Sequence, residues 1–133
     1  MRTASLNFYA PSKKKQRPEA RLQKAVVQIL KLDANPGVLW FSIPNEGKRS
    51  VVVGAELKAM GLRPGAADLC FIIRGRAHFL ELKADNGKQS PEQVAFAAAC
   101  ATAGAVYALA WTIGEALAIL ASWGAILRVR VAA

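Results

Sequence analysis

The feature that most constrains the fold is a pair of apolar segments on either side of a short turn. Residues 67–73 and 77–83 are rich in leucine, isoleucine and phenylalanine, and Arg74-Gly75-Arg76 separates them. Two such segments joined by a short glycine-containing connection are typical of a β-hairpin. The pattern therefore predicts two antiparallel strands, over 67–73 and 77–83.

The segments around this hairpin alternate between helical and strand-like patterns. Ser90-Pro91-Glu92-Gln93 is a strong helix start, because Ser90 can act as N-cap, Pro91 fits the first helical position and Gln93 completes a capping box. The elements expected along the chain are a helix over 18–32, a strand over 38–43, a short helix ending at Gly61, the hairpin, a helix from Ser90 to Gly104, a strand over 105–111, a helix from Thr112 to Gly124 and a strand over 126–131. This order predicts an α/β fold with a central mixed sheet flanked by helices.

Length and charge indicate one domain with a polyanionic partner. The chain has 133 residues, which suits a single domain over 18–133. Its net charge of +9 favours nucleic acid, because basic side chains that neutralise phosphates release counterions. Residues 1–17 offer little to bury and are expected to form a flexible basic arm. The arm's basic residues are candidate DNA contacts or simply solvated side chains: Lys13, Lys14, Lys15 and Arg17.

Cysteine, histidine and hydropathy patterns exclude several classes. Cys70 and Cys100 lie in apolar segments and are expected to be reduced core residues of a cytoplasmic protein. A zinc cluster is excluded by the single histidine and the absence of closely spaced cysteines. Residues 94–114 carry no charge, but they are rich in alanine and open with a helix cap typical of soluble proteins. We therefore expect no membrane span.

The second hairpin strand carries the residues that suggest chemistry. Glu81 and Lys83 are two apart, so they share one face, while Leu80 and Leu82 face the other way. Pairing around the turn can bring Asp68 near Glu81. Hard cations such as Mg²⁺ prefer oxygen ligands, and these two carboxylates with the Leu82 backbone carbonyl would supply them. A lysine beside them suits phosphodiester hydrolysis.

A further carboxylate lies in the first expected helix. At about 100° per residue, Glu19 projects within about 20° of Val26 and Leu30, so it is predicted to point toward the core side. It either joins the site, positioning water or a second metal, or only favours the helix N-terminus.

Taken in order, these motifs resemble the VRR-NUC (virus-type replication-repair nuclease) family of the PD-(D/E)xK superfamily, which has a restriction-endonuclease-like core. The resemblance spans about 18–107. It rests on Asp68 and Glu81-Leu82-Lys83 behind a helix glutamate, and on three further segments: Pro44-Asn45-Glu46-Gly47, Gly61-Leu62-Arg63-Pro64-Gly65 and Gly87 to Gln93.

The resemblance implies a role for each matching residue. Asp68 and Glu81 would be ligands of Mg²⁺ or Mn²⁺, Lys83 the catalytic lysine, Glu19 the helix carboxylate and Gln93 a glutamine bordering the site, although capping alone also explains Gln93. Further expected DNA contacts are Asn45, Lys48, Arg49 and Lys88, with a solvated loop as the alternative for Lys48 and Arg49.

The resemblance also implies a biological setting. Family members hydrolyse DNA, and short stand-alone forms resemble homodimeric, structure-specific endonucleases acting on junctions or flaps in DNA repair. A bacterial or phage-infected cytoplasm is implied in the same way. The family commonly has proline before the motif aspartate, whereas Ala67 precedes Asp68 here. With the basic arm, this departure motivates the alternative of a non-catalytic DNA-binding module with a nuclease-like fold.

Overall fold

The computed structural model describes residues 18–44 and 51–127. The elements in chain order are α2 (Pro18–Asp33), β1 (Leu39–Ser42), α3 (Val51–Ala59), β2 (Leu69–Ile73), β3 (Arg76–Leu82), α4 (Pro91–Ala103), β4 (Val106–Ala110) and α5 (Ile113–Trp123). This succession confirms the α/β class. The predicted basic arm over 1–17 and residues 128–131 of the predicted last strand lie outside the described residues.

The strands form one mixed sheet in the order β1-β2-β3-β4. β1 pairs with β2 and β2 with β3 in antiparallel fashion, whereas β3 and β4 are parallel. At the hairpin turn, Arg74 has φ 50° and Gly75 has φ 77°. Two successive left-handed residues are typical of a two-residue turn of type I′. The connection is therefore one residue shorter than predicted, because Arg76 already belongs to β3.

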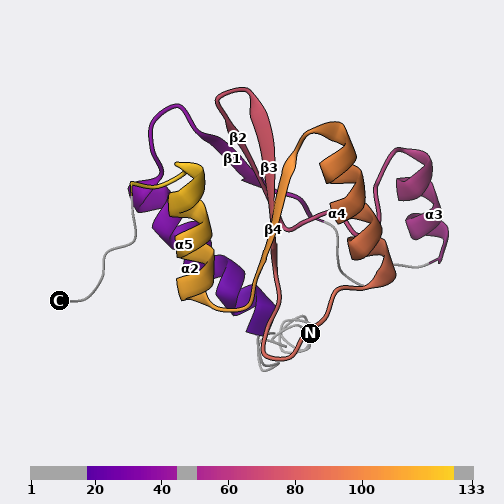
Figure 1. Ribbon diagram of the computed structural model, residues 1–133. Helices are drawn as coiled ribbons and strands as arrows, with labels where there is room; N and C mark the ends of the chain where they lie inside the picture. Colours follow the sequence, from indigo (N-terminus) through magenta and orange to yellow (C-terminus); the bar gives the residue numbers. More distant parts are fainter. Residues whose placement is uncertain (1–17, 45–50, 128–133) are drawn as a thin grey trace, which may run out of the picture.

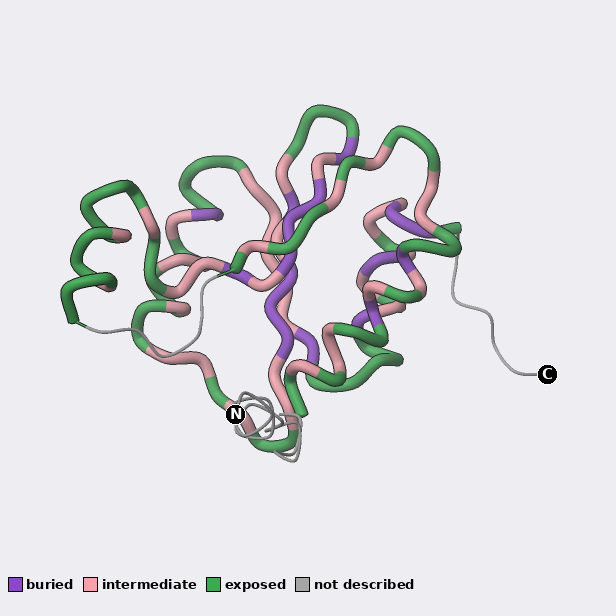
Figure 2. The backbone as a smooth tube through the Cα atoms, turned by 180° about the vertical axis from the view of Figure 1, so that it is seen from behind, coloured by how far each residue is buried: buried purple, intermediate pink, exposed green. Residues whose placement is uncertain are grey.

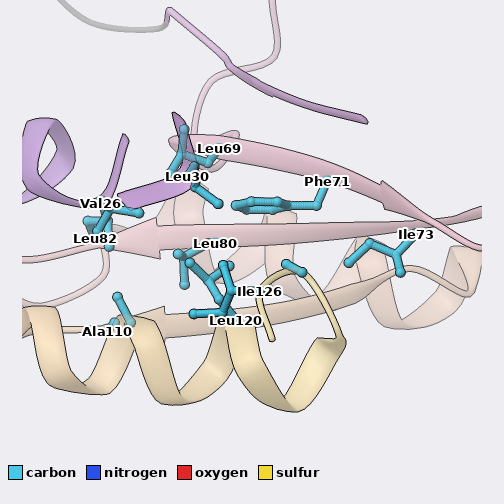
Figure 3. Packing of buried hydrophobic residues seen from close by; sticks show 12 residues of the cluster. Val26, Leu30, Leu69, Phe71, Ile73, Leu80, Leu82, Ala110, Leu120 and Ile126 are labelled. Atoms are coloured by element: carbon cyan, nitrogen blue, oxygen red, sulfur yellow. The ribbon is translucent and has the colours of Figure 1, made fainter. Parts of the chain in front are cut away.

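Helices lie on both sides of the sheet: α2 and α5 cover one face, α4 covers the other, and α3 lies beyond α4 (Figure 1). The hydrophobic core lies between the sheet and the α2/α5 layer (Figure 3). Leu80 and Leu82 are fully buried there, as predicted. Because successive side chains of a strand alternate between faces, Glu81 is turned toward the α4 side.

The layer under α4 is aromatic. Phe96 of α4 lies with its ring centroid 5.1 Å from that of Phe79 and 6.1 Å from that of Tyr107. Cys70 and Cys100 are buried and unbridged, as predicted, and burial raises the pKa of both thiols. Aromatic and thiol packing thus fixes α4 over β2, β3 and β4.

Helix α3 differs from the others because it has no buried residues. Val51, Val52 and Met60 are all strongly exposed, and the tube in Figure 2 shows this segment almost entirely as exposed. Among the helices described, none is long and apolar enough to cross a membrane.

Candidate active site

The hairpin brings Asp68 to Glu81. The register pairs Leu69 with Leu80, so extending it by one residue places Asp68 opposite Glu81. Side chains of directly opposed residues lie on the same face of a sheet, with Cβ atoms about 5 Å apart. Oδ2 of Asp68 also accepts a hydrogen bond of 2.8 Å from the backbone N–H of Leu82. The predicted approach of the two carboxylates is therefore present in the structure.

Glu81 is a buried charged residue with charged and polar neighbours. Its side chain is almost fully covered, with the residue 3% exposed. Nε2 of Gln93 donates a hydrogen bond of 2.8 Å to Oε2 of Glu81, and Nζ of Lys83 lies 3.9 Å from the same oxygen. A buried carboxylate is costly without such partners. Glu81, Lys83 and Gln93 thus form one polar cluster, as the sequence predicted.

The loop after β3 holds the lysine in place. Gly87 donates its N–H to the Ala84 carbonyl at 2.7 Å, and its own carbonyl accepts from Nε1 of Trp111 at 2.9 Å. A Cβ at Gly87 would lie 3.4 Å from both Cβ and Cδ of Lys83. The loop backbone therefore packs along the lysine side chain, which keeps the ammonium on the Glu81 side.

A second close approach fixes the start of α4. Gly65 has φ 84°, and a Cβ at this position would lie 2.3 Å from the Glu92 carbonyl oxygen and 2.8 Å from the backbone nitrogen of Gln93. Only a glycine allows this approach. The segment before Asp68 thus rests directly on the helix turn that carries Gln93.

Tyr107 is a neighbour of the site that the sequence did not indicate. Burial raises the pKa of its phenol to about 12; the Gln89 hydrogen bond acts in the opposite direction, and the charges of Glu81, Cys100 and Asp68 raise the pKa further. Nε2 of Gln89 donates to the Tyr107 hydroxyl at 3.1 Å. Tyr107 lies here because β4 pairs in parallel with β3, a contact between distant segments that local patterns do not reveal.

Glu19 lies on the same side of α2 as Val26 and Leu30, as helical spacing predicts, but it does not reach the core. Glu19 is exposed, because it lies in the first turn of α2, almost two turns before Val26, the first buried residue of that helix. Lys88 is exposed. The other predicted DNA contacts lie outside the described residues: Lys13, Lys14, Lys15, Arg17, Asn45, Lys48 and Arg49.

Ring side chains also pack on the opposite face of the sheet. His78 is buried on the face opposite Glu81, and its ring centroid lies 5.0 Å from that of Trp123. It therefore belongs to the core. Trp40 and Trp123 pack partly against the same core.

The donor chemistry of the cluster suits a hard cation. Within the described ranges, no group of three or more His, Cys, Asp and Glu residues is placed to hold a metal ion. Two carboxylates face each other, however, and the N–H of Leu82 points toward Asp68. In an extended strand, the N–H and C=O of one residue point to the same neighbouring strand. The Leu82 carbonyl is therefore on the Asp68 side, as a third oxygen donor.

Two solved structures share this architecture. One, named "VRR_NUC domain protein", has a TM-score of 0.68 and 22% identity, covering 82% of this chain and 89% of that chain. Another, named "VRR_NUC domain", has a TM-score of 0.51 and 24% identity, covering 75% of this chain and 90% of that chain. This chain has the VRR-NUC fold. No family model and no curated protein matches the sequence.

The VRR-NUC fold confirms the nuclease-like α/β architecture predicted from the sequence. In this chain, Asp68 directly precedes β2, Glu81 lies in β3 and Lys83 directly follows β3. The next helix, α4, adds Gln93 to the same face of the sheet.

Proposed function

We propose that this chain is a metal-dependent DNA endonuclease of the VRR-NUC family. The observation that carries the proposal is the placement of Asp68 opposite Glu81 on one face of the β2–β3 hairpin, with Lys83 beside Glu81. Two facing carboxylates and a lysine on a nuclease-like fold are the side chains that metal-assisted phosphodiester hydrolysis needs. The net charge of +9 suits a DNA substrate.

Asp68 and Glu81, with the Leu82 carbonyl, would hold Mg²⁺ or Mn²⁺. Such an ion supplies an activated water and neutralises charge that develops on the phosphoryl group. The hydrogen bond from the Leu82 N–H fixes the orientation of the Asp68 carboxylate. The bond from Gln93 does the same for Glu81. Both acids are thus oriented before any ligand arrives.

The remaining residues act on the substrate. Lys83 would place its ammonium against the scissile phosphate, where charge builds up in the transition state. Glu19, exposed in the first turn of α2, is proposed as an auxiliary carboxylate that positions water. Contacts to the DNA backbone are assigned to Lys88 and to residues beyond the described ranges: Lys13, Lys14, Lys15, Arg17, Asn45, Lys48 and Arg49.

The proposed substrate is branched DNA, cut by a homodimer in the cytoplasm of a bacterial or phage-infected cell during DNA repair. Two sites related by a two-fold axis suit a symmetric junction. Size-exclusion chromatography with light scattering tests the homodimer. A monomer at the working concentration would contradict the resolution of junctions, whereas cleavage of a single strand would remain compatible with it.

Cleavage itself is tested with purified protein on linear, flapped and four-way DNA, with Mg²⁺, with Mn²⁺ or with chelator. We expect cleavage only with divalent metal, and its loss in Glu81→Ala and Lys83→Ala. Glu56→Ala is the matched control, because Glu56 is an exposed carboxylate on α3 and its loss should leave the rate unchanged. Cleavage that survives in both site variants would refute this active site.

The same assay separates the enzyme from the alternative function. A DNA-binding module with a nuclease-like fold would bind DNA in a salt-dependent manner and cleave none of the substrates with either metal.

Calorimetric titration with Mn²⁺ adds a readout that does not depend on activity. We expect heat of binding in the original chain and its loss in Asp68→Ala, since Asp68 supplies a ligand oxygen.

A further inference from the structure

We propose that an open groove between α2 and the edge strand β1 binds a single strand of DNA. The groove has a volume of about 510 Å³. It lies on the face of the sheet opposite Glu81, since Trp40, which lines it, pairs with the core residue Phe71. It is therefore a second site. Its role in holding one strand of the DNA substrate rests on the proposed nuclease function.

One stripe of α2 forms a wall of this groove. Ala20, Lys24, Val27 and Lys31 follow at helical spacing, so they share one side of the helix. Both lysines are exposed, whereas Ala20 and Val27 are half-buried. With a rise of 1.5 Å per residue, the two lysines are about 10 Å apart along the helix. They present two positive charges above an apolar surface.

The sheet side of the groove adds an aromatic ring. Trp40 is half-buried and lines the groove together with the exposed Ser42. No acidic residue is among the described residues that line it. An indole ring with lysines nearby is the combination that binds single-stranded nucleic acid, because bases stack on the ring while ammonium groups contact phosphates. A duplex fits less well, since its base faces are already stacked on one another.

The groove ends close to the backbone of Asp68. Ser42 pairs with Leu69, and the next residue, Ile43, donates its N–H to the Asp68 carbonyl at 2.9 Å. A strand that leaves the groove past Ser42 therefore reaches the end of the sheet where Asp68 lies, and from there it would pass around that end to the face that carries Glu81. This geometry suits a branched substrate, in which one unpaired strand is held while a neighbouring phosphate is cut.

Binding is tested in chelator with the Glu81→Ala variant and a labelled single-stranded thymidine oligonucleotide, so that cleavage plays no part. We expect salt-dependent binding and quenching of tryptophan fluorescence. The Lys24→Gln/Lys31→Gln double variant should lower the slope of log K against log salt by about 1.4, because each phosphate contact with single strands contributes about 0.7. Both lysines are exposed, so this variant should fold normally.

Lys58→Gln is the matched control, because Lys58 is exposed on α3, at the other end of the molecule from α2 (Figure 1). In Lys58→Gln, the slope of log K against log salt should change by less than the contribution of about 0.7 expected for one groove lysine. Trp40→Phe should lose most of the quenching and weaken binding several-fold, since base stacking on the indole is reduced.

Three outcomes would overturn the proposal: an unchanged salt slope in the double variant, quenching that persists in Trp40→Phe, or equal binding of a blunt duplex that competes for the same site. Binding without cleavage in the original chain would instead sustain the groove and refute the proposed nuclease. If the double variant cleaves branched DNA with unchanged rate and affinity, the proposed nuclease is sustained and the groove is refuted.

Discussion

Gln93 joins the start of α4 to Glu81. Its Oε1 accepts a hydrogen bond of 2.9 Å from the Ser90 N–H, which completes the capping box, and its Nε2 donates at 2.8 Å to Oε2 of Glu81. One side chain therefore both caps the helix and orients a carboxylate of the site. The two explanations that the sequence left open for Gln93 are compatible.

Replacing Gln93 with glutamate should separate these two roles. In Gln93→Glu the new carboxylate can still cap Ser90, but the donor to Glu81 is lost and two negative charges meet. We expect a loss of about 1–3 kcal/mol in unfolding free energy at pH 7 without metal. The pKa of the carboxylate pair is raised in the folded variant, so this deficit should shrink as the pH falls toward 5.

Urea unfolding in chelator at several pH values measures this effect. Gln28→Glu is the control, because Gln28 is exposed on α2 and the same chemical change should alter stability by less than about 0.5 kcal/mol. A deficit in Gln93→Glu that does not change with pH would contradict the charge argument.

Gly65→Ala should destabilise the protein through contact with α4. The added Cβ would lie 2.3 Å from the Glu92 carbonyl oxygen, at a φ of 84°. Gly37→Ala is a close control, with φ 89° and nothing within 4 Å of the added Cβ. We expect a loss of about 1–2 kcal/mol for the control, from the left-handed backbone alone. A clearly larger loss is expected at Gly65, measured by thermal unfolding; equal losses would show that the close approach is relieved without cost.

Tyr107 should keep its phenolic proton at pH values well above the ordinary pKa of a tyrosine side chain. Since its pKa in the folded protein is about 12, against an ordinary value of 10, the unfolded chain releases this proton first as the pH rises. The resulting stability is fully present below pH 10 and is lost between pH 10 and 12. The ultraviolet difference spectrum between the original chain and Tyr107→Phe isolates this phenol, and a midpoint at its ordinary value would contradict the burial that we describe.

Lys83 and Lys88 should respond differently to the same substitution. Lys83 lies beside Glu81, with its side chain 11% exposed, whereas Lys88 is exposed. On the proposed function, Lys83→Gln should lower the cleavage rate at saturating DNA by about 10²- to 10³-fold. Lys88→Gln should leave that rate unchanged and reduce the salt slope of duplex binding by about 0.9. A loss of cleavage rate of similar size in both variants would contradict the assignment of Lys83 to the chemical step and of Lys88 to DNA binding.

Local patterns predicted much of this fold. The hairpin and the helix start at Ser90 were found from the sequence, because turn residues and caps act over a few neighbouring residues. Alternation along β3 also placed Glu81 and Lys83 on one face and Leu80 on the other, as observed.

Longer-range features were not predictable in the same way. Helical periodicity gave the direction in which Glu19 projects but not the position along α2 at which burial begins, so its exposure was missed. Tyr107 reaches the site through the parallel pairing of β3 with β4. That pairing depends on packing across the whole chain, which no short motif encodes.

The alternation along β3 has a consequence for how this hairpin can change in evolution or design. Leu82 packs into the core and Glu81 faces α4, so neighbouring residues serve opposite layers. Inserting or deleting one residue between Gly75 and Glu81 would reverse both, directing a carboxylate into the apolar core and a leucine toward the side of the sheet where Gln93 lies. The length of this strand is therefore fixed more tightly than its composition, and tolerated insertions should be confined to its turn or come in pairs.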